Sequence, residues 1–461
     1  MEYVKYAVDA AYFATIFLFV MGLKRMAHPR TATSGIKWAG AGMVLATVAT
    51  FAYPGVMANP INVALIVIAI VSSVGIAWVT GKKVAMTDMP QMIALYNGMG
   101  GGSAGAISAV VLFGGGDHDP TQMVLAVAGA IIGTVSFSGS IIAWAKLDGR
   151  IKGVLRFKGI QAFNGLLFLS TAAIGAYIAL WHGGHGAMVI FFALALFFGV
   201  MMTLPIGGAD MPVVISLYNA FTGLAVAFEG FVIGNPAMII AGTIVGAAGS
   251  LLTALMATAM NRSVSNVLFS NFGEVSDDSD SEFEGEMKEI DKPDAAIQMA
   301  YASKVIIVPG YGMAVAQAQH KVWELVQILR ERGVTVKFAI HPVAGRMPGH
   351  MNVLLAEAGV PYDIIYDLDE INNEFKTADV AMVIGANDVV NPVAKTDPSS
   401  PIYGMPVLNV DEARNIIIVK RGKGAGFSGI QNKLFFLDNS RMLYGDATEV
   451  TNQLIASVKE F

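Results

Sequence analysis

Residues 1–262 consist of long apolar stretches separated by short polar segments. A helix needs about 20 mostly apolar residues to cross the hydrocarbon of a bilayer, which is about 30 Å thick. Nine stretches are long enough, or nearly so, and they lie at residues 3–23, 37–53, 60–80, 90–113, 121–145, 159–181, 187–206, 211–233 and 236–260. The pattern therefore predicts an all-α membrane bundle of nine transmembrane helices over residues 1–262.

The pattern changes beyond residue 262. Residues 263–293 are acidic and rich in Ser, a composition that cannot bury a core, so we expect a flexible acidic linker. In residues 294–461 short apolar runs alternate with helix-like segments. Strands are expected at 304–308, 334–340, 362–366, 379–384, 406–409 and 415–419. Helices are expected at 312–332, 350–358, 369–376 and 446–459. This alternation predicts an α/β Rossmann-like domain with a parallel sheet, whose ligands bind at the carboxyl ends of the strands.

The loops of the membrane half sort by charge. Every second loop carries basic residues, namely Lys24, Arg25, Arg30, Lys37, Lys82, Lys83, Lys146, Arg150, Lys152, Arg156, Lys158 and Arg262. The alternate loops contain no Lys or Arg. By the positive-inside rule the basic loops face the cytoplasm, which places the N-terminus outside and residues 294–461 in the cytoplasm. An odd number of spans also requires the N-terminus and residues 294–461 to lie on opposite sides of the membrane.

Composition excludes several kinds of chemistry. The chain has no Cys, which excludes thiolate metal sites, iron–sulfur clusters and disulfides, and we expect no metal site. A net charge of −5 without a basic tract argues against nucleic acid. The first apolar run ends in Lys24-Arg25 without the features of a cleavable signal peptide. Because the chain has no Cys, any redox chemistry must use a bound cofactor.

The membrane half contains an internal repeat. The sequence DMPQMIALYN at Asp88–Asn97 matches DMPVVISLYN at Asp210–Asn219, and four spans separate the two copies. Parallel repeats suit a transport path between two halves. Each Asn lies about 13 Å along its helix from the Asp, close to mid-bilayer. Two interpretations stay open: the amides belong to such a path, or they hold helices together.

Other polar residues of the spans have structural alternatives. Glu229 lies deep in an apolar run, and it either faces an aqueous vestibule or, as we expect, extends to the membrane surface. Ser138 and Ser140 lie among small residues, where close helix packing explains them without any function. His182 and His185 lie in a Gly-rich outer loop and are expected to be solvated, and another outer loop holds Asp117, His118 and Asp119.

The first expected strand of the soluble half leads into Gly310-Tyr311-Gly312-Met313-Ala314-Val315. This run fits the G-x-G-x-x-A/V pattern between a strand and a helix, in which the helix start holds a pyrophosphate. A potassium-channel filter also contains Gly-Tyr-Gly, but the preceding residues and the soluble context differ.

Two further loops indicate which dinucleotide is bound. The second expected strand ends in Ala339-Ile340-His341-Pro342, without the acid that usually holds the ribose hydroxyls of NAD. A cationic, Gly-rich loop, Lys420–Gly426, follows the sixth expected strand and suits a 2′-phosphate, although a solvated basic turn is the alternative. The balance favours NADP(H). Asp388, in Gly385-Ala386-Asn387-Asp388, is either a titratable acid beside the cofactor or a residue that fixes its own turn.

These motifs, with residues 341–357, Gln431-Asn432 and Met260–Ser263, resemble the beta-subunit family of the proton-translocating NAD(P) transhydrogenases over essentially the whole chain. The resemblance implies that residues 294–461 bind NADP(H) in a reversed orientation. It implies an alpha subunit that carries NAD(H) and further transmembrane helices, with direct hydride transfer between the two nicotinamides. A dimer of alpha–beta units in a bacterial cytoplasmic (inner) membrane is expected.

The resemblance also assigns roles to residues. The pyrophosphate would lie at the Gly310 turn, the 2′-phosphate at Lys420 and Arg421, and the adenosine beside Gly445-Asp446-Ala447. Residues 420–429 would form a lid. The complete set of expected cofactor-binding residues is Gly310, Tyr311, Gly312, Ala314, Val315, Arg346, Gly385, Asn387, Asp388, Lys420, Arg421, Gly422, Gly426, Gly445, Asp446 and Ala447. Asp388 would act in coupling and not as an acid or base.

One departure concerns the proton path. Many relatives carry a membrane His where this chain has Asn97, and Asn219 is no substitute because an amide does not titrate. The relay would then use an ionisable residue of the partner subunit, or Glu229 with water. The candidates on this chain are Asn97, Asn219, Asp210, Ser140 and Glu229.

Two functions follow as hypotheses. In the first, hydride passes from NADH to NADP⁺ and proton entry through the membrane half drives the reaction. In the alternative, a transporter or channel is regulated by an NADP(H)-sensing domain. That alternative requires nucleotide binding but neither hydride transfer nor an NAD(H)-binding partner.

Overall fold

The computed structural model describes residues 2–53, 56, 59–115, 119–151, 153, 155, 157–181, 183–207, 210–260, 263–269, 286–345, 349–398, 400, 402–422 and 430–461. Several residues with expected roles lie outside the described residues, namely Asp117, His118, Lys152, Arg156, His182, Arg262, the acidic run 277–282, Arg346, Gly426 and most of the 420–429 loop. The chain divides into two compact units. The first comprises residues 1–206 and 214–252, and the second residues 207–213 and 253–461.

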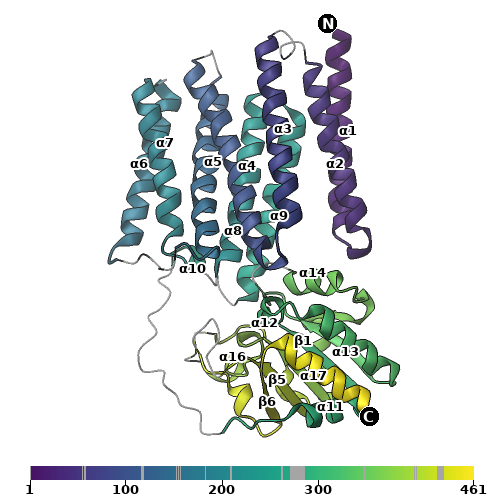
Figure 1. The fold of residues 1–461 in the computed structure, drawn as a ribbon. Helices are drawn as coiled ribbons and strands as arrows, with labels where there is room; N and C mark the ends of the chain where they lie inside the picture. Colours follow the sequence, from purple (N-terminus) through teal and green to yellow (C-terminus); the bar gives the residue numbers. More distant parts are fainter. Residues whose placement is uncertain are drawn as a thin grey trace. The chain divides into compact units, whose positions relative to one another are not determined.

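Each of the nine apolar stretches forms a long helix with a near-parallel axis (Figure 1). The helices are α1 Glu2–Met26, α2 Pro29–Phe51, α3 Pro60–Lys83, α4 Met89–Gly114, α5 Pro120–Leu147, α6 Ile160–Trp181, α7 His185–Thr203, α8 Met211–Val232 and α9 Pro236–Ala259. Among the described residues, 7 helices are long and apolar enough to cross a membrane. They do not include α2, which carries Lys37, or α4, which carries Asn97 and many glycines.

Helices α4 and α5 approach each other at backbone distance. A Cβ atom on Gly101 would lie 2.9 Å from the carbonyl oxygen of Gly133, and one on Gly133 would lie 2.8 Å from that of Gly101. Small residues permit such contact where lipid offers no hydrophobic driving force for association. The hydroxyl of Ser138 donates to the carbonyl oxygens of Thr134 and Val135 in its own helix.

The second unit contains a six-stranded parallel sheet in the order β3-β2-β1-β4-β5-β6. Its strands are β1 Lys304–Pro309, β2 Thr335–Ile340, β3 Ile365–Asp367, β4 Val380–Ile384, β5 Asn415–Lys420 and β6 Ser440–Tyr444. Strands β1 and β4 are buried almost throughout because both sheet faces are covered, which explains their continuous apolar sequences.

Helices α11 (Lys292–Ala300), α13 (Gln319–Glu331) and α17 (Ala447–Glu460) pack together on one face of the sheet, and Figure 1 shows α13 and α17 lying across it. The opposite face packs against α15 (Leu368–Ile371) and the 3-10 turns at 372–377, 410–412 and 433–436, whose apolar side chains include Phe375 and Phe435. The remaining helices are α10 Val264–Phe269, α12 Tyr311–Val315, α14 His350–Glu357 and α16 Val393–Thr396, and further 3-10 turns span 86–88, 362–364 and 388–390.

Residues 288–290 lie beside β6: Ile290 donates its N–H to the carbonyl oxygen of Met442 over 3.0 Å.

The helix expected over 312–332 is interrupted. It ends at Val315 and resumes at Gln319, and Gln317 between them has a φ of 52°. The hydroxyl of Thr448 donates to the carbonyl oxygen of Ala316 over 2.6 Å, so a side chain from α17 takes a backbone acceptor within the break. A tertiary contact therefore overrides the helical preference of this alanine-rich segment.

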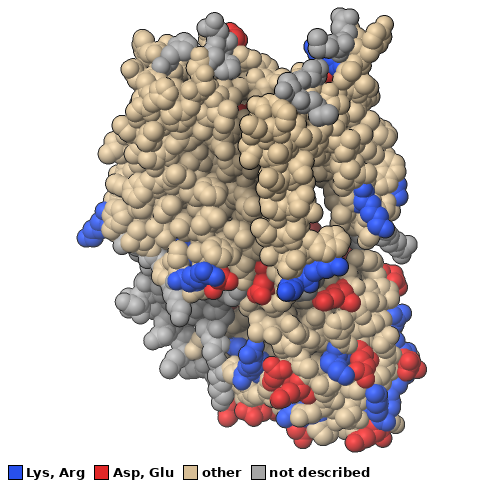
Figure 2. Space-filling view, turned by 45° about the horizontal axis from the view of Figure 1, so that its top comes forward, with Lys and Arg blue, Asp and Glu red and all other residues tan. Residues whose placement is uncertain are grey.

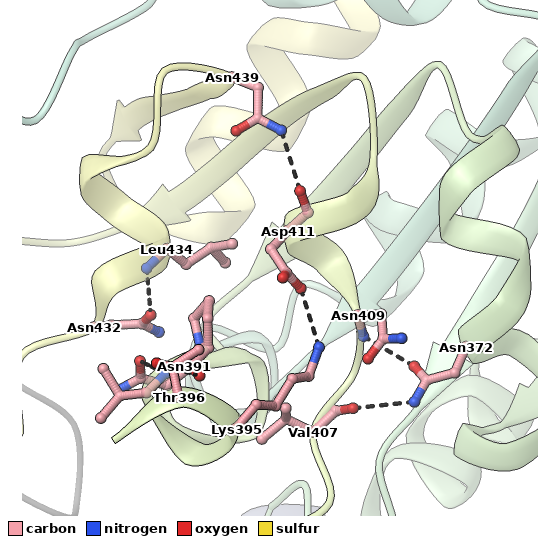
Figure 3. Close-up of polar contacts among 12 residues, drawn as sticks. Asn372, Asn391, Lys395, Thr396, Val407, Asn409, Asp411, Asn432, Leu434 and Asn439 are labelled. Atoms are coloured by element: carbon pink, nitrogen blue, oxygen red, sulfur yellow. Dashed lines mark hydrogen bonds and ion pairs between the residues drawn. The ribbon is translucent and has the colours of Figure 1, made fainter. Parts of the chain in front are cut away.

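The strand expected at 406–409 does not form. Instead, the side-chain amide of Asn372 donates to the carbonyl oxygen of Val407 over 3.1 Å and accepts from the N–H of Asn409 over 2.9 Å (Figure 3). The sixth strand is β6, so Lys420 ends the fifth strand of the sheet. The other local differences are small: residues 362–364 form a 3-10 turn before β3, and the helix expected at 369–376 is α15 followed by a 3-10 turn.

Candidate functional site

The carboxyl ends of β1 and β4 interlock. The N–H of Gly310 donates to the carbonyl oxygen of Ile384, and that of Gly312 donates to the carbonyl oxygen of Gly385, both over 2.9 Å. A Cβ on Gly310 would lie 2.5 Å from Cα of Ala386, so only glycine permits this approach. Two amides of the turn expected to hold a pyrophosphate are thus already bonded within the protein.

This interlocked corner lies at the point where the order of the sheet reverses. Strand β1 lies between β2 and β4, and the chain crosses from the β3 edge to β4 on the other side of β1. Ligands of open parallel sheets bind outside the carboxyl ends of the strands at such a point. The expected site residues Gly310, Gly385, Asn387 and Asp388 all follow β1 or β4 here.

Two asparagines tie the segment after the 420–429 loop to the segment after β4. Asn391, fully buried, donates to the carbonyl oxygen of Gln431 over 3.1 Å and accepts from the N–H of Lys433 over 3.3 Å. Asn432, also buried, donates to both the backbone and the side-chain oxygen of Asn387 over 2.9 and 3.0 Å. From the residues alone, no role was predicted for Asn391 or Asn432.

Lys420 brings a positive charge to the same end of the sheet. Its ammonium lies 4.7 Å from the centroid of the Phe435 ring. Burial lowers the pKa of Lys420 below its ordinary value, and the nearby Asp388 carboxylate opposes that effect. Lys420 therefore occupies a partly desolvated position within electrostatic reach of Asp388. Arg421 and Gly422 continue the chain and are exposed.

The residues expected to border an adenosine lie beside Lys420. The N–H of Gly445 donates to the carbonyl oxygen of Lys420 over 3.1 Å, and Gly445 has a φ of 148°, which favours glycine. Asp446 caps α17 by accepting from the N–H of Thr448 over 2.9 Å. The structure therefore brings these residues to the carboxyl ends of β5 and β6, the second of which is a strand that the sequence did not predict. Two further expected site residues lie in the turn after β1: Ala314 is buried, and Val315 is 40% exposed.

His341 directly follows β2, where the sequence analysis noted only the absence of an acid. Its ring Nε2 lies 2.7 Å from the carbonyl oxygen of Pro406, and its Nδ1 accepts from the N–H of Val343 over 3.2 Å. These contacts require the tautomer with the proton on Nε2. Burial lowers the pKa of His341 to about 4, so the ring is neutral.

The first unit has a polar seam along α4, α5 and α8. In it, Asn97 donates to the hydroxyl of Ser140 over 3.0 Å, the hydroxyl of Ser136 lies 2.6 Å from that of Thr222, and the hydroxyl of Ser108 donates to Glu229. These three contacts follow one another along the helices. Asn219 is half-buried, and Asp210, which directly precedes α8, is 3% exposed.

The position of Glu229 corrects an expectation. Its side chain is 0% exposed and does not extend to the surface. A Cβ on Gly129 of α5 would lie 2.5 Å from its Oε1 atom, so the carboxyl group fills a space that glycine leaves open between helices. The other carboxyl oxygen, Oε2, has no hydrogen-bond partner among the described residues.

The two copies of the repeat have different surroundings. The hydroxyl of Tyr218 in the second copy is fully buried and lies 2.6 Å from that of Thr203. Tyr96 in the first copy is 36% exposed, and its hydroxyl lies 2.8 Å from that of Thr80. Equivalent sequences therefore do not have equivalent packing.

Comparison with known proteins decides the family. The family model described as "NAD(P) transhydrogenase beta subunit" matches residues 8–457. The chain belongs to the NAD(P) transhydrogenase beta-subunit family. Its relatives include NAD(P) transhydrogenase subunit beta of Rhodospirillum rubrum, found both for the species and for one named strain. Each is 44% identical over 476 residues, which cover 97% of this chain and 98% of the relative.

Membership in the transhydrogenase beta-subunit family gives a context to the two units. The long apolar helices belong to a membrane protein, and the parallel sheet is consistent with nucleotide binding. Among the described residues, no cluster of three His, Cys, Asp or Glu side chains could hold a metal ion.

Proposed function

We propose that residues 294–461 form a Rossmann-like domain that binds NADP(H), and that the chain works with an NAD(H)-binding alpha subunit as a proton-translocating transhydrogenase. The observation that carries the proposal is the meeting of β1, β4 and β5 at the reversal point of the sheet. There the glycine turns, Asp388 and Lys420 come from separate parts of the sequence.

The residues at this point fit a phosphorylated dinucleotide. Lys420 and Arg421 would bind the 2′-phosphate through charge-assisted hydrogen bonds. Because Lys420 is partly desolvated, an added anion would favour its charged form more than it would in open water. Gly445, Asp446 and Ala447 adjoin Lys420 and would border the adenosine. Tyr311, Arg346, Gly422 and Gly426 complete the proposed set.

NADP(H) itself supplies the hydride chemistry when bound, so no side chain needs to act as a general acid or base. The protein positions the cofactor and keeps its reactive face accessible to the partner's nicotinamide. Gly310, Gly312 and Gly385 hold the two strand ends in contact, which fixes the surface against which the dinucleotide would lie. Asp388 would link that surface to the state of the membrane half.

We propose that the nine long helices span a bacterial inner membrane. On the face that Figure 2 shows, the surface of the long helices is almost free of charged side chains, whereas charges cover the parallel-sheet domain. Helix α3 has no buried residue within this chain, as expected of a helix that faces lipid or the alpha subunit's helices. The N-terminus would lie outside, and the assembly would be a dimer of alpha–beta units.

The proton path would use the polar seam. Asn97 and Ser140 bond to each other, and Asn219 and Asp210 belong to the second repeat copy. Glu229 is an ionisable group of the seam and contacts Ser108 of α4 and Gly129 of α5. Because Asn97 cannot titrate, an ionisable group of the alpha subunit would complete the relay. Coupling requires that proton occupancy favour one of two states with different NADP(H) affinity.

The test uses inverted membrane vesicles that contain this chain and its alpha subunit. NADPH and an NAD⁺ analogue are added, and both analogue reduction and lumenal pH are followed. Hydride transfer with acidification that an uncoupler abolishes is the expected result. Tight NADP⁺ binding with neither signal, from a folded and partnered sample, would favour the transporter or channel regulated by nucleotide.

A further inference from the structure

One donor at the proposed nucleotide site has no acceptor within the protein. The side-chain Nδ2 of Asn387 is buried, and no hydrogen-bond partner for it exists among the described residues. Asn387 follows β4 directly, at the corner where the sheet order reverses. A buried amide N–H without an acceptor costs folding free energy, so such groups in native proteins usually have a ligand or another role.

Asn432 determines which way this amide points. Its Nδ2 lies 3.0 Å from Oδ1 of Asn387 and 2.9 Å from the backbone oxygen of the same residue. The Oδ1 of Asn432 accepts from the N–H of Leu434 over 2.9 Å, so its own amide cannot turn over without losing that bond (Figure 3). Asn387 must therefore direct its oxygen toward Asn432 and its N–H₂ group away.

Two backbone amides near Asn387 cannot replace its side chain as hydrogen-bond donors to a ligand. The amides of Gly310 and Gly312 already donate to β4 and its following residue, so they are not available to a ligand. Asn432 is 2% exposed and Asn391, which bonds to both neighbours of Asn432, is 0% exposed. The orientation of Asn387 is thus fixed by buried groups before any ligand binds.

We propose that Asn432 is a positioning residue of the nucleotide site: it holds Asn387 so that Nδ2 donates a hydrogen bond to an acceptor oxygen of NADP(H). This inference rests on the proposed NADP(H) function. The oxygen belongs either to the nicotinamide carboxamide or to the ribose–phosphate part of the cofactor, and both sources present the same hydrogen-bond acceptor. A preset donor of this kind lowers the cost of ordering the site on binding.

The test measures the dissociation constant of NADP⁺ by calorimetry on the intact alpha–beta complex in nanodiscs. The variants are Asn387→Ala, Asn432→Ala, Asn432→Asp and the double variant Asn387→Ala/Asn432→Ala. Each single change is expected to weaken NADP⁺ about tenfold, the order expected for one lost hydrogen bond. The double variant should lose no more than Asn387→Ala alone, because Asn432 acts through Asn387.

Asn432→Asp separates orientation from packing. Aspartate keeps the shape and the acceptor for Leu434, but it offers no donor to Asn387, whose N–H₂ group would then turn toward the new carboxylate. NADP⁺ affinity should therefore fall as far as in Asn432→Ala. If Asn432→Asp binds NADP⁺ like the wild type, or if the two single losses multiply in the double variant, the proposal is overturned.

The matched control is Asn372→Ala. Asn372 also holds a loop through both ends of its amide, but both ends are paired within the protein (Figure 3). It should lower the melting temperature without changing NADP⁺ affinity. If the Asn432 variants likewise change only the melting temperature, their role is structural and the proposal fails.

A second ligand locates the acceptor oxygen. The 2′-phosphate form of ADP-ribose lacks nicotinamide. If Asn387→Ala weakens this compound as much as NADP⁺, the oxygen lies in the ribose–phosphate part. If it weakens NADP⁺ alone, the oxygen is the carboxamide's. A wild-type complex that does not bind NADP⁺ would reject the proposed function itself, whereas wild-type binding with unaffected variants would reject only the role of Asn432.

Discussion

At the scale of single residues, the basic pair at the end of β5 makes the sharpest prediction about the ligand. Replacing both Lys420 and Arg421 by Ala should weaken NADP⁺ roughly hundredfold, because two charge-assisted hydrogen bonds are lost, and should leave NAD⁺ binding by the complex unchanged. Binding is measured by calorimetry. Lys459→Ala is the control, since Lys459 pairs with Glu324 on helices away from the site. Equal losses for NADP⁺ and NAD⁺ would contradict the 2′-phosphate role.

The neutral ring of His341 makes a prediction about pH. Its pKa of about 4 in the folded protein lies below the ordinary value of 6.5, so the unfolded segment binds a proton more readily than the folded one. The contribution of neutral His341 to the local free energy of unfolding should therefore be fully present above pH 6.5. It should fall as the pH drops toward 4, by about 1.4 kcal/mol per pH unit. Hydrogen exchange of residues 335–345 in the intact protein measures this local stability.

The variant His341→Gln serves as the control for that titration. Glutamine can donate to Pro406 but takes up no proton in this range, so the exchange rates of residues 335–345 should lose their excess pH dependence. If the dependence persists in this variant, another group is responsible.

At the scale of elements, the contact between α4 and α5 predicts an asymmetry between two glycines of the same helix. Gly101→Ala should destabilise the protein by about 1–3 kcal/mol, the usual cost of overpacking, because its Cβ would meet Gly133 at 2.9 Å. Gly114→Ala should be harmless, since nothing lies within 4 Å of its Cβ position. Thermal unfolding of the detergent-solubilised complex compares the two, and equal melting temperatures would contradict the close approach.

Elements also show which features the sequence could predict. For eight of the nine apolar stretches, the predicted first residue lies within two residues of the first residue of the observed helix. Long hydrophobic runs bounded by Pro or charged residues can form few structures other than a long helix. Residues 406–409 resemble a strand because Val407 and Leu408 are apolar, yet a distant amide holds them. Strand β6 was missed because Ser440 and Arg441 interrupt its apolar pattern.

The same distinction applies to the candidate site. The residues following β1, β4 and β5 were predicted to converge because parallel strands end at one edge, and the structure brings Gly310, Gly385 and Lys420 there. Asn391 and His341 could not be predicted in their roles. Their partners, Gln431 and Pro406, lie far away in sequence, and no local pattern reports such a contact.

At the scale of the whole molecule, the buried carboxyl group of Glu229 offers a test of the proposed coupling between the membrane half and the reaction. Glu229→Gln keeps the size of the side chain but removes its titration. We expect at least a tenfold slower proton-coupled reaction in vesicles. Lumenal pH and analogue reduction are recorded together. Wild-type acidification in this variant would remove Glu229 from the path.

The interlock between the Gly310 and Gly385 turns restricts how this protein can evolve. A side chain at position 310 or 312 would overlap backbone of the facing turn, and one at position 385 would also face a φ of 65°. No single substitution elsewhere can move a backbone aside, so none of these positions can drift neutrally with one compensating partner. In a saturation library selected for activity, we therefore expect glycine alone to survive at all three positions.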